Sequence, residues 1–270
     1  MMLNALLSRA MSGEKIAMLT CYDATFAKLM HLAGVDMLLV GDSLGMVIQG
    51  GDSTLGVTMQ DMLYHTRIVA KGAPGAVIMS DMPVDSYEHD LADALQNAQA
   101  LIEAGAHIVK IEGGGHMVET ARYLVENGVP VCAHLGFTPQ SVEKLGGYKI
   151  QGKTEAAGQV ILKDAQEMAA AGASMVLFEM VPAALATHIT ETISIPTIGI
   201  GAGAGCSGQV LVLQDLLGIY TGPAEKNPQD YKAPRFAQNF LGQTGNIEKA
   251  IINYVQAVKC GEFPAVQHSY

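Results

Sequence analysis

The chain has 270 residues and a formal net charge of −10, with an isoelectric point near 5.2. Because its lysines and arginines do not cluster, this acidic balance argues against a nucleic-acid-binding protein. Hydrophobic residues make up 49% of the chain, yet they fall in runs well below the ~20 residues that cross a bilayer. We therefore expect a soluble protein that contacts neither nucleic acid nor membrane, with strands buried on both faces.

The cysteines and the N-terminal segment indicate where the protein works. Four cysteines, at positions 21, 132, 206 and 260, lie far apart and form no CxxC motif. Neither a zinc site nor a disulfide framework is therefore expected. The first residues lack the charged segment, apolar core and cleavage site of a secretory signal. We expect a cytoplasmic protein whose residues 1–270 form a single barrel domain, since the length suits that fold.

Short apolar runs of β-type recur along the whole chain. They lie at residues 15–23, 35–40, 75–83, 106–113, 129–136, 173–180, 195–203 and 209–215. Glycines precede four of them, at positions 34, 105, 128 and 172, where the C-terminal cap of a helix needs a left-handed residue. Amphipathic segments of helical length occupy residues 58–72, 90–105 and 154–172. This alternation predicts a repeated strand–helix unit.

About eight such units favour a closed (β/α)8 barrel over an open parallel sheet, although the count alone is compatible with either. After the last strand, residues 221–234 are expected to form a polar loop and residues 236–258 one further helix. The predicted fold is thus a single α/β barrel with an extra C-terminal helix.

Ionisable side chains follow five consecutive predicted strands, the second to the sixth. They are Asp42 with Ser43, Asp81, Lys110 with Glu112, His134 and Glu179. In a barrel the C-terminal strand ends converge on one mouth, where polar side chains are functional. Lys110 and Glu112 are two residues apart, so on a strand they face the same side. The pattern predicts a polar site at the mouth of the barrel.

Most of these residues also have a purely structural interpretation. Asp42 and Asp81 are favoured N-cap residues for a following helix. Lys110 and Glu112 would also suit a buried ion pair that serves the fold alone.

The histidines and Glu179 differ in how strongly they indicate function. A histidine such as His134 is, on its own, more often a core or loop residue than a catalytic group, and we assign His107 and His116 to that category. Glu179 lies in the apolar stretch FEMVP, where an unpaired carboxylate is costly. Its position favours a base with a raised pKa. Considered together, the strand-end residues favour a functional site.

Three carboxylates without a cysteine or histidine cluster are hard oxygen ligands, which suit Mg²⁺ better than zinc. Asp42, Asp81 and Glu112 are the predicted ligands. A 2-oxo acid chelates such an ion through its carboxylate and ketone oxygens, and polarising the ketone acidifies the adjacent C–H. Glu179 would remove that proton while Lys110 stabilises the enolate. The residues predict metal-assisted enolisation followed by making or breaking of a carbon–carbon bond.

Sequence blocks between about Lys15 and Gly203 carry a resemblance to a known family. They read CYDATFAKL, LLVGDSLGMVIQGGDSTL, SDMP, VKIEGG, HLGFTPQSV, GGYKIQG, FEMVP and PTIGIGAG. As a set they resemble the ketopantoate hydroxymethyltransferase family. The resemblance implies a (β/α)8 barrel related to the phosphoenolpyruvate/pyruvate enzymes, dependence on Mg²⁺ and a place in pantothenate biosynthesis. It also implies 5,10-methylenetetrahydrofolate as one-carbon donor and a homo-oligomer, typically a decamer.

The resemblance assigns the metal and substrate ligands. It implies that Asp42 and Asp81 bind both the metal and the keto acid, and that Ser43 contacts the keto acid as well. Lys110 would contact the substrate, and Glu112 would complete the metal site.

The same resemblance places His134 near the substrate and makes Glu179 the proton acceptor. Glu179 would take the C3 proton of 3-methyl-2-oxobutanoate, and the enolate would attack the methylene carbon of the opened folate iminium. Hydration and release would give 2-dehydropantoate and tetrahydrofolate. Residues 218–236 form a longer and more polar connection than the one common in the family. This departure bears on the region expected to bind folate and on the packing of subunits, and it leaves the implied chemistry unchanged.

Two other functions stay open on the sequence alone. A lyase or mutase on the same kind of barrel would act on a small acid without folate. A binding or scaffold barrel with an inert mouth would show no Mg²⁺-dependent turnover. The glycines of GIGAGAG (199–205) lack the GxGxxG dinucleotide fingerprint, and they suit either a close backbone approach to a ligand or a tight turn.

Overall fold

The eight strands form a closed parallel barrel. The structure, a computed structural model, describes residues 2–223 and 227–270. The strands are β1 (Ile16–Thr20), β2 (Met37–Val40), β3 (Val77–Asp81), β4 (Ile108–Glu112), β5 (Val131–Gly136), β6 (Met175–Glu179), β7 (Thr197–Ile200) and β8 (Gly208–Leu211). They pair in chain order, and β8 returns to β1. This closure confirms the predicted barrel and excludes the open sheet.

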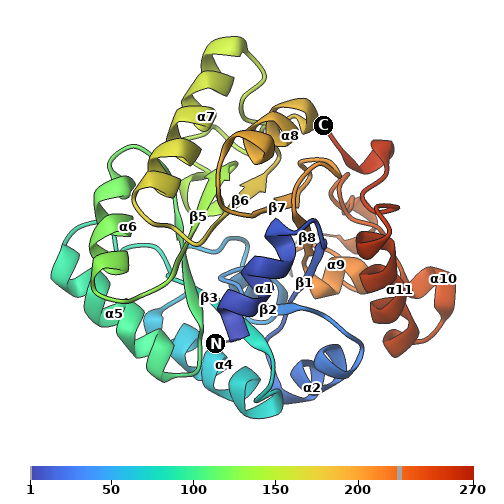
Figure 1. The fold of residues 1–270 in the computed structure, drawn as a ribbon. Coiled ribbons are helices and arrows are strands. Elements are labelled where there is room, and N and C mark those ends of the chain that lie inside the picture. Colours follow the sequence, from blue (N-terminus) through green and yellow to red (C-terminus); the bar gives the residue numbers. More distant parts are fainter. Residues whose placement is uncertain (1, 224–226) are drawn as a thin grey trace.

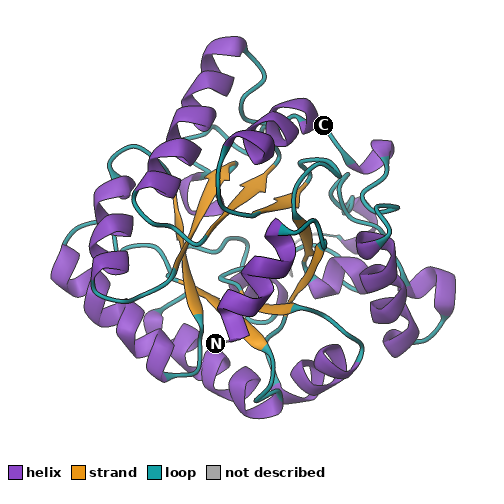
Figure 2. Ribbon diagram, in the orientation of Figure 1, coloured by secondary structure: helices purple, strands orange, loops and turns teal. Residues whose placement is uncertain are grey.

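Helices surround the barrel (Figures 1 and 2). They are α1 (Met2–Met11), α2 (Ala24–Leu32), α3 (Leu44–Val47), α4 (Met59–Gly72), α5 (Leu91–Glu103), α6 (Met117–Glu126), α7 (Glu155–Ala170), α8 (Ala183–Thr192), α9 (Leu213–Leu217), α10 (Leu241–Thr244) and α11 (Ile247–Lys259), with 3₁₀ turns at Pro139–Ser141, Pro228–Asp230 and Val266–His268. The predicted helices at 58–72, 90–105 and 154–172 are α4, α5 and α7. The four predicted cap glycines have φ between 82° and 114°, which confirms their left-handed conformation.

The N-terminal end of the barrel is covered by α1, which buries Leu3, Leu6 and Ala10. Figure 1 shows α1 across the barrel opening, and the C-terminus beside α8. The Ala183 N–H donates to the carbonyl of Tyr270 at 2.8 Å, which fixes the last residue against the start of α8.

A C-terminal helix is present as α11, but the expected single helix over residues 236–258 is wrong at its start. Gly245, with φ 63°, ends α10, and the side chain of Asn246 accepts from the Lys249 N–H to begin α11. A left-handed glycine followed by an N-cap breaks one helix into two. The hydroxyl of Tyr254 in α11 lies 2.9 Å from the Met18 carbonyl and 3.0 Å from the Gln209 carbonyl. The helix therefore covers the seam between β1 and β8.

Two connections after β7 are irregular. Residues 201–207 join β7 to β8 without a helix. The predicted polar loop at 221–234 is described at 221–223 and 227–234, where it contains the Pro228–Asp230 turn. Residues 224–226 of that prediction lie outside the described part of the chain. Among the described residues, no helix is long and apolar enough to cross a membrane.

Methionines fill the barrel beneath its C-terminal mouth. Met18, Met37 and Met79 on the neighbouring strands β1 to β3, and Met175 on β6, are all fully buried. Met79 is two residues before Asp81 and therefore lies on the same face of β3. An adaptable apolar side chain fills such an interior well. The polar strand ends thus stand on an apolar floor.

Candidate active site

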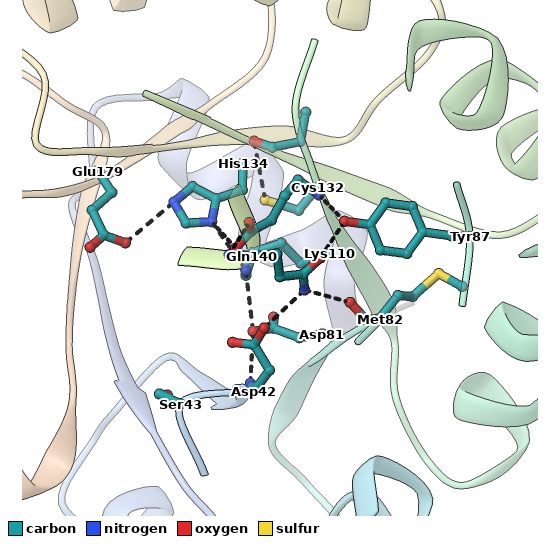
Figure 3. A network of polar contacts seen from close by, with 12 residues as sticks. Asp42, Ser43, Asp81, Met82, Tyr87, Lys110, Cys132, His134, Gln140 and Glu179 are labelled. Carbon is teal, nitrogen blue, oxygen red and sulfur yellow. Dashed lines mark hydrogen bonds and ion pairs between the residues drawn. The ribbon is translucent and has the colours of Figure 1, made fainter. Parts of the chain in front are cut away.

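The C-terminal ends of β2 to β6 bring the predicted site residues to one cavity of about 160 Å³ (Figure 3). All seven line it, namely Asp42, Ser43, Asp81, Lys110, Glu112, His134 and Glu179. Five stand on strands β3 to β6, while the other two follow β2 directly. The sequence therefore predicted correctly which strand ends meet.

Strand register explains the closest pairs. Asp81 is the register partner of Lys110, and Glu112 is that of His134. Asp81 Oδ2 lies 3.2 Å from Lys110 Nζ, and both side chains are no more than 4% exposed. Glu112 Oε1 lies 3.3 Å from His134 Nδ1. Lys110 thus forms its ion pair with Asp81 on the neighbouring strand β3 rather than with Glu112 on its own strand.

His134 links the lysine to Glu179. Its Nδ1 lies 3.3 Å from Lys110 Nζ, and its Nε2 lies 3.4 Å from Glu179 Oε2. An ammonium group only donates, so Nδ1 accepts and the ring proton of the neutral imidazole is on Nε2, facing Glu179. Burial and then the charge of Lys110 lower the pKa of His134, which agrees with a neutral ring.

The backbone around Glu179 is specialised. Gly136, its register partner on β5, has φ 95°, and a Cβ there would collide with the Glu179 carbonyl. Met180, the next residue, has φ 49°, a conformation that non-glycine residues rarely adopt and that is concentrated at functional sites. The chain therefore turns sharply where the Glu179 side chain, 14% exposed, reaches the cavity.

Asp42 and Asp81 do not act as helix caps. Ser43 is the N-cap residue of α3, without a hydrogen bond from its side chain to the helix. Its Oγ lies 2.9 Å from the Tyr22 hydroxyl oxygen. The Asp42 N–H donates to Asp81 Oδ2 at 3.0 Å, and after Asp81 the next helix begins only at Leu91. Both carboxylates belong to the cavity wall instead.

Two residues that the sequence reasoning missed connect the carboxylates. The Gln140 side-chain amide donates to Asp42 Oδ2 at 2.8 Å, and the Gln140 backbone N–H donates to Glu112 Oε2 at 2.9 Å. The Tyr87 hydroxyl donates to Gln140 Oε1 at 2.6 Å and accepts from the Glu112 N–H at 3.0 Å. Each stands six residues past a strand-end residue that the sequence had singled out. Their place in the loops that follow β3 and β5 is the one sequence signal that they share.

The cluster carries more negative than positive charge. Burial, reinforced by the charge of Glu112, raises the pKa of Asp42 to about 6. Burial also raises the pKa of Asp81 to about 6 and that of Glu112 to about 7, against the opposing effect of Lys110. Burial lowers the pKa of Lys110, but the surrounding carboxylates outweigh it and leave that pKa raised. Burial raises the pKa of Glu179 as well.

The donor set suits a hard cation. Asp81 Oδ1 and Glu112 Oε1 are buried and accept no hydrogen bond from any described residue. Over residues 2–223 and 227–270, however, no three His, Cys, Asp or Glu side chains are already grouped to hold a metal ion. This arrangement fits Mg²⁺, which is commonly held by one or two carboxylates, with water and substrate oxygens as its remaining ligands.

The glycines of residues 199–205 serve close packing. A Cβ on Gly205 would collide with the side chain of Thr187, and one on Gly203 would collide with Ala183. A Cβ on Gly201, which has φ 61°, would lie 2.8 Å from the ring of Tyr270. The glycines are thus explained by close packing against α8 and against the ring of Tyr270.

Comparison with known proteins identifies the family. Residues 1–266 match the family model described as ketopantoate hydroxymethyltransferase. The chain belongs to this family. A 3-methyl-2-oxobutanoate hydroxymethyltransferase of Nitrosospira multiformis is 56% identical over 258 residues, which are 96% of this chain and 95% of that protein. The protein of the same name from Chromobacterium violaceum is 54% identical over 267 residues, with 99% and 98% covered.

Solved structures share the barrel with this member of the ketopantoate hydroxymethyltransferase family. A phosphonopyruvate hydrolase in complex with oxalate and Mg²⁺ has a TM-score of 0.61 at 13% identity, covering 78% of this chain and 81% of that chain. A 2,3-dimethylmalate lyase of the PEP mutase/isocitrate lyase superfamily has a TM-score of 0.59 at 15% identity, covering 78% and 80%. At these identities the likeness is one of fold, and it agrees with the expected barrel type.

Proposed function

We propose that the protein transfers a hydroxymethyl group from 5,10-methylenetetrahydrofolate to 3-methyl-2-oxobutanoate, giving 2-dehydropantoate and tetrahydrofolate. Residues 1–270 act as one catalytic domain, with the strand-end cavity as its active site. The observation that carries the proposal is Glu179, a carboxylate of raised pKa that reaches this cavity beside the neutral ring of His134. The name that the curated relatives bear supports the choice of keto acid.

Glu179 takes the proton from C3 of the keto acid. A carboxylate with a raised pKa is a stronger base, closer to the pKa that is most effective near neutral pH. His134 stands beside the base, with its Nε2 3.4 Å from Glu179 Oε2. Lys110, with its charge fixed in the cavity wall, stabilises negative charge that develops on the enolate oxygen, and Ser43 contributes a hydroxyl to substrate binding.

We assign Asp42, Asp81 and Glu112 to Mg²⁺, with the first two also contacting the keto acid. The buried oxygens of Asp81 and Glu112 that accept no hydrogen bond from described residues support this assignment. When bound, the ion would supply Lewis-acid polarisation of the ketone. The chain itself holds the carboxylates in place, through Gln140 and through the Asp42 N–H.

The overall transfer balances with one water molecule. The carbanion formed at C3 makes a bond to the methylene carbon, and both bonds from that carbon to folate nitrogens break. The oxygen of water becomes the new hydroxyl group. The proton lost from C3 and one proton of water end on the two nitrogens, so no oxidant or reductant is needed.

Proton NMR of 3-methyl-2-oxobutanoate in D₂O tests the first step. With protein and Mg²⁺ we expect deuterium at C3, and Glu179→Gln is expected to slow its incorporation by about 10²–10⁴-fold, the usual contribution of a general base. Glu167→Gln, on the exposed side of α7, is the matched control and should exchange like the wild type. Wild-type protein that leaves C3 protonated with and without added folate contradicts the proposal.

Turnover assays separate this function from that of a lyase or mutase. We expect product only when methylenetetrahydrofolate is present, whereas a lyase or mutase would act on a small acid without it. The cytoplasmic location, expected from the cysteines and the N-terminal segment, stays a prediction. So does the homodecamer, which the family resemblance implies; sedimentation velocity of the purified protein checks it.

A further inference from the structure

A second cavity, of about 460 Å³, adjoins the active-site cavity. The two share Glu179 and four aromatic residues, namely Tyr148, Tyr220, Tyr231 and Phe236. Of these two cavities, Tyr270 lines only the larger one. We refer to the larger one, with these five aromatic residues, as the tyrosine cavity. Its volume lies within the range of about 300–1,000 Å³ typical of small-molecule sites.

Tyr220 and Tyr231 together form an aromatic part of the wall of the tyrosine cavity. Tyr220 and Tyr231 pack edge to face, with ring centroids 5.2 Å apart and planes at 78°. The Tyr220 hydroxyl is buried and has no hydrogen-bond partner among the described residues. A buried polar atom without a partner is costly, so this hydroxyl indicates a ligand with polar atoms.

The position of Glu179 determines what must occupy the tyrosine cavity. Glu179 lines both cavities and therefore stands at their junction. The smaller cavity, of about 160 Å³, contains the charged residues that suit the keto acid. The carbanion forms where Glu179 removes the proton, so the one-carbon donor has to reach the same point from the other side. The tyrosine cavity offers that approach.

We infer that the tyrosine cavity binds the reduced pteridine ring of the folate donor, with its methylene carbon directed toward Glu179. This inference rests on the proposed function and adds the place where the second substrate binds. Aromatic side chains bind flat heterocycles by stacked and edge-to-face contacts, and the Tyr220 hydroxyl supplies a hydrogen bond to a pteridine nitrogen or oxygen. Tyr220 and Tyr231 both belong to the long polar segment 218–236, which thereby gains a role.

Calorimetric titration with tetrahydrofolate, under anaerobic conditions and with Mg²⁺ and keto acid present, tests the inference. Tyr231→Leu and Tyr270→Leu are each expected to weaken tetrahydrofolate binding about tenfold, through loss of a ring contact. Tyr64→Leu, an exposed tyrosine on α4, is the matched control and should bind like the wild type. Because Tyr270 lines the tyrosine cavity but not the active-site cavity, Tyr270→Leu should leave the Kd for 3-methyl-2-oxobutanoate within about twofold.

An aromatic replacement distinguishes ring contact from a folding defect. The chain has no tryptophan, so Tyr231→Trp introduces a single tryptophan, which is excited selectively over the tyrosines, into the cavity wall. We expect this variant to bind tetrahydrofolate within about threefold of the wild type and its fluorescence to be quenched on binding. Unquenched fluorescence at saturating tetrahydrofolate overturns the placement.

The results separate this inference from the proposed function. If the wild type binds no tetrahydrofolate and does not use methylenetetrahydrofolate, the proposed donor is wrong. If the wild type binds it and both leucine variants bind equally well, the function stands and the tyrosine cavity is not the site. Selective weakening in the leucine variants, with quenching in Tyr231→Trp, supports the inference.

Discussion

Charged side chains gather at both ends of the barrel, but they are balanced differently. At the N-terminal end, Lys259 lies 2.8 Å from Glu14 and 2.7 Å from Asp36. Arg9 lies 3.2 Å from each of the same carboxylates. Two cations therefore meet two anions. At the C-terminal mouth, three buried carboxylates and the partly exposed Glu179 surround Lys110 and a neutral imidazole.

The difference separates charges that stabilise the fold from charges kept for chemistry. At the N-terminal end, the hydrogen bond from Lys259 lowers the pKa of Glu14. At the mouth, burial raises the pKa of Asp42, Asp81 and Glu112. Removing charges from water without balancing them costs stability. The mouth thus holds negative charge that a bound cation would neutralise, and four measurements test this contrast.

Removing the positive charge of Lys110 from the mouth of the barrel should have the largest effect on stability. Lys110→Met is expected to lower the free energy of unfolding by about 3 kcal/mol at pH 7 in chelator, since it leaves Asp81 buried without its partner. Urea denaturation gives the value. Lys28→Met, on the exposed side of α2, should change it by less than about 0.5 kcal/mol. Equal, small losses in both variants would show that the mouth charges are not coupled.

The pH dependence of stability should have opposite signs at the two ends. For acids with raised pKa values, the folded state binds more protons than the unfolded state between about pH 4 and 7, so stability falls as pH rises through that window. Glu112→Gln is expected to flatten this fall by up to about 1.4 kcal/mol per pH unit. For Glu14, with its lowered pKa, stability is instead lost as pH falls, and Glu14→Gln should remove that loss.

Urea denaturation at several pH values in chelator measures both slopes. An unchanged slope in Glu112→Gln would mean that this carboxylate titrates as it does in the unfolded chain. That result would contradict a raised pKa of Glu112 in the folded protein.

Loss of the amide that holds Asp42 should weaken metal binding. Gln140→Ala keeps the backbone N–H that binds Glu112 but removes the side-chain hydrogen bond to Asp42. We expect the Kd for Mg²⁺, measured by calorimetry without substrate, to rise about tenfold, as for other residues that orient metal ligands. Gln151→Ala, whose side chain donates to the Lys149 carbonyl in the same loop, is the control. Equal affinities in the two variants would exclude this role for Gln140.

Breaking the ion pairs at the N-terminal end of the barrel should have the smallest effect on stability. Lys259→Ala is expected to lower the free energy of unfolding by about 1 kcal/mol, because its side chain is only partly exposed and contacts two carboxylates. Lys163→Ala breaks an exposed pair with Glu167 at 3.7 Å and should cost about 0.3 kcal/mol. High salt should reduce the former loss, and denaturation in low and high salt tests this.

The sequence predicted the barrel and the strand ends more reliably than the loops. Strand and helix periodicity is local, and it located all eight strands together with Asp81, Lys110 and Glu179 at their ends. Helix boundaries depended on details such as Gly245 and Asn246, so the predicted helix over 236–258 began too early. Gln140 and Tyr87 escaped because a polar residue in a loop carries no periodic signal.

The sequence by itself determined where the strands lie along the chain, the glycine caps and the gathering of charge at one end, because each follows from short-range pattern or from the parallel direction of the strands. Only the tertiary structure decided that Lys110 pairs with Asp81 and that Gln140 bridges Asp42 and Glu112. Those contacts join residues far apart in the chain, through strand register and the path of loops. No local pattern encodes such distances, and the same holds for the tyrosine cavity beside Glu179.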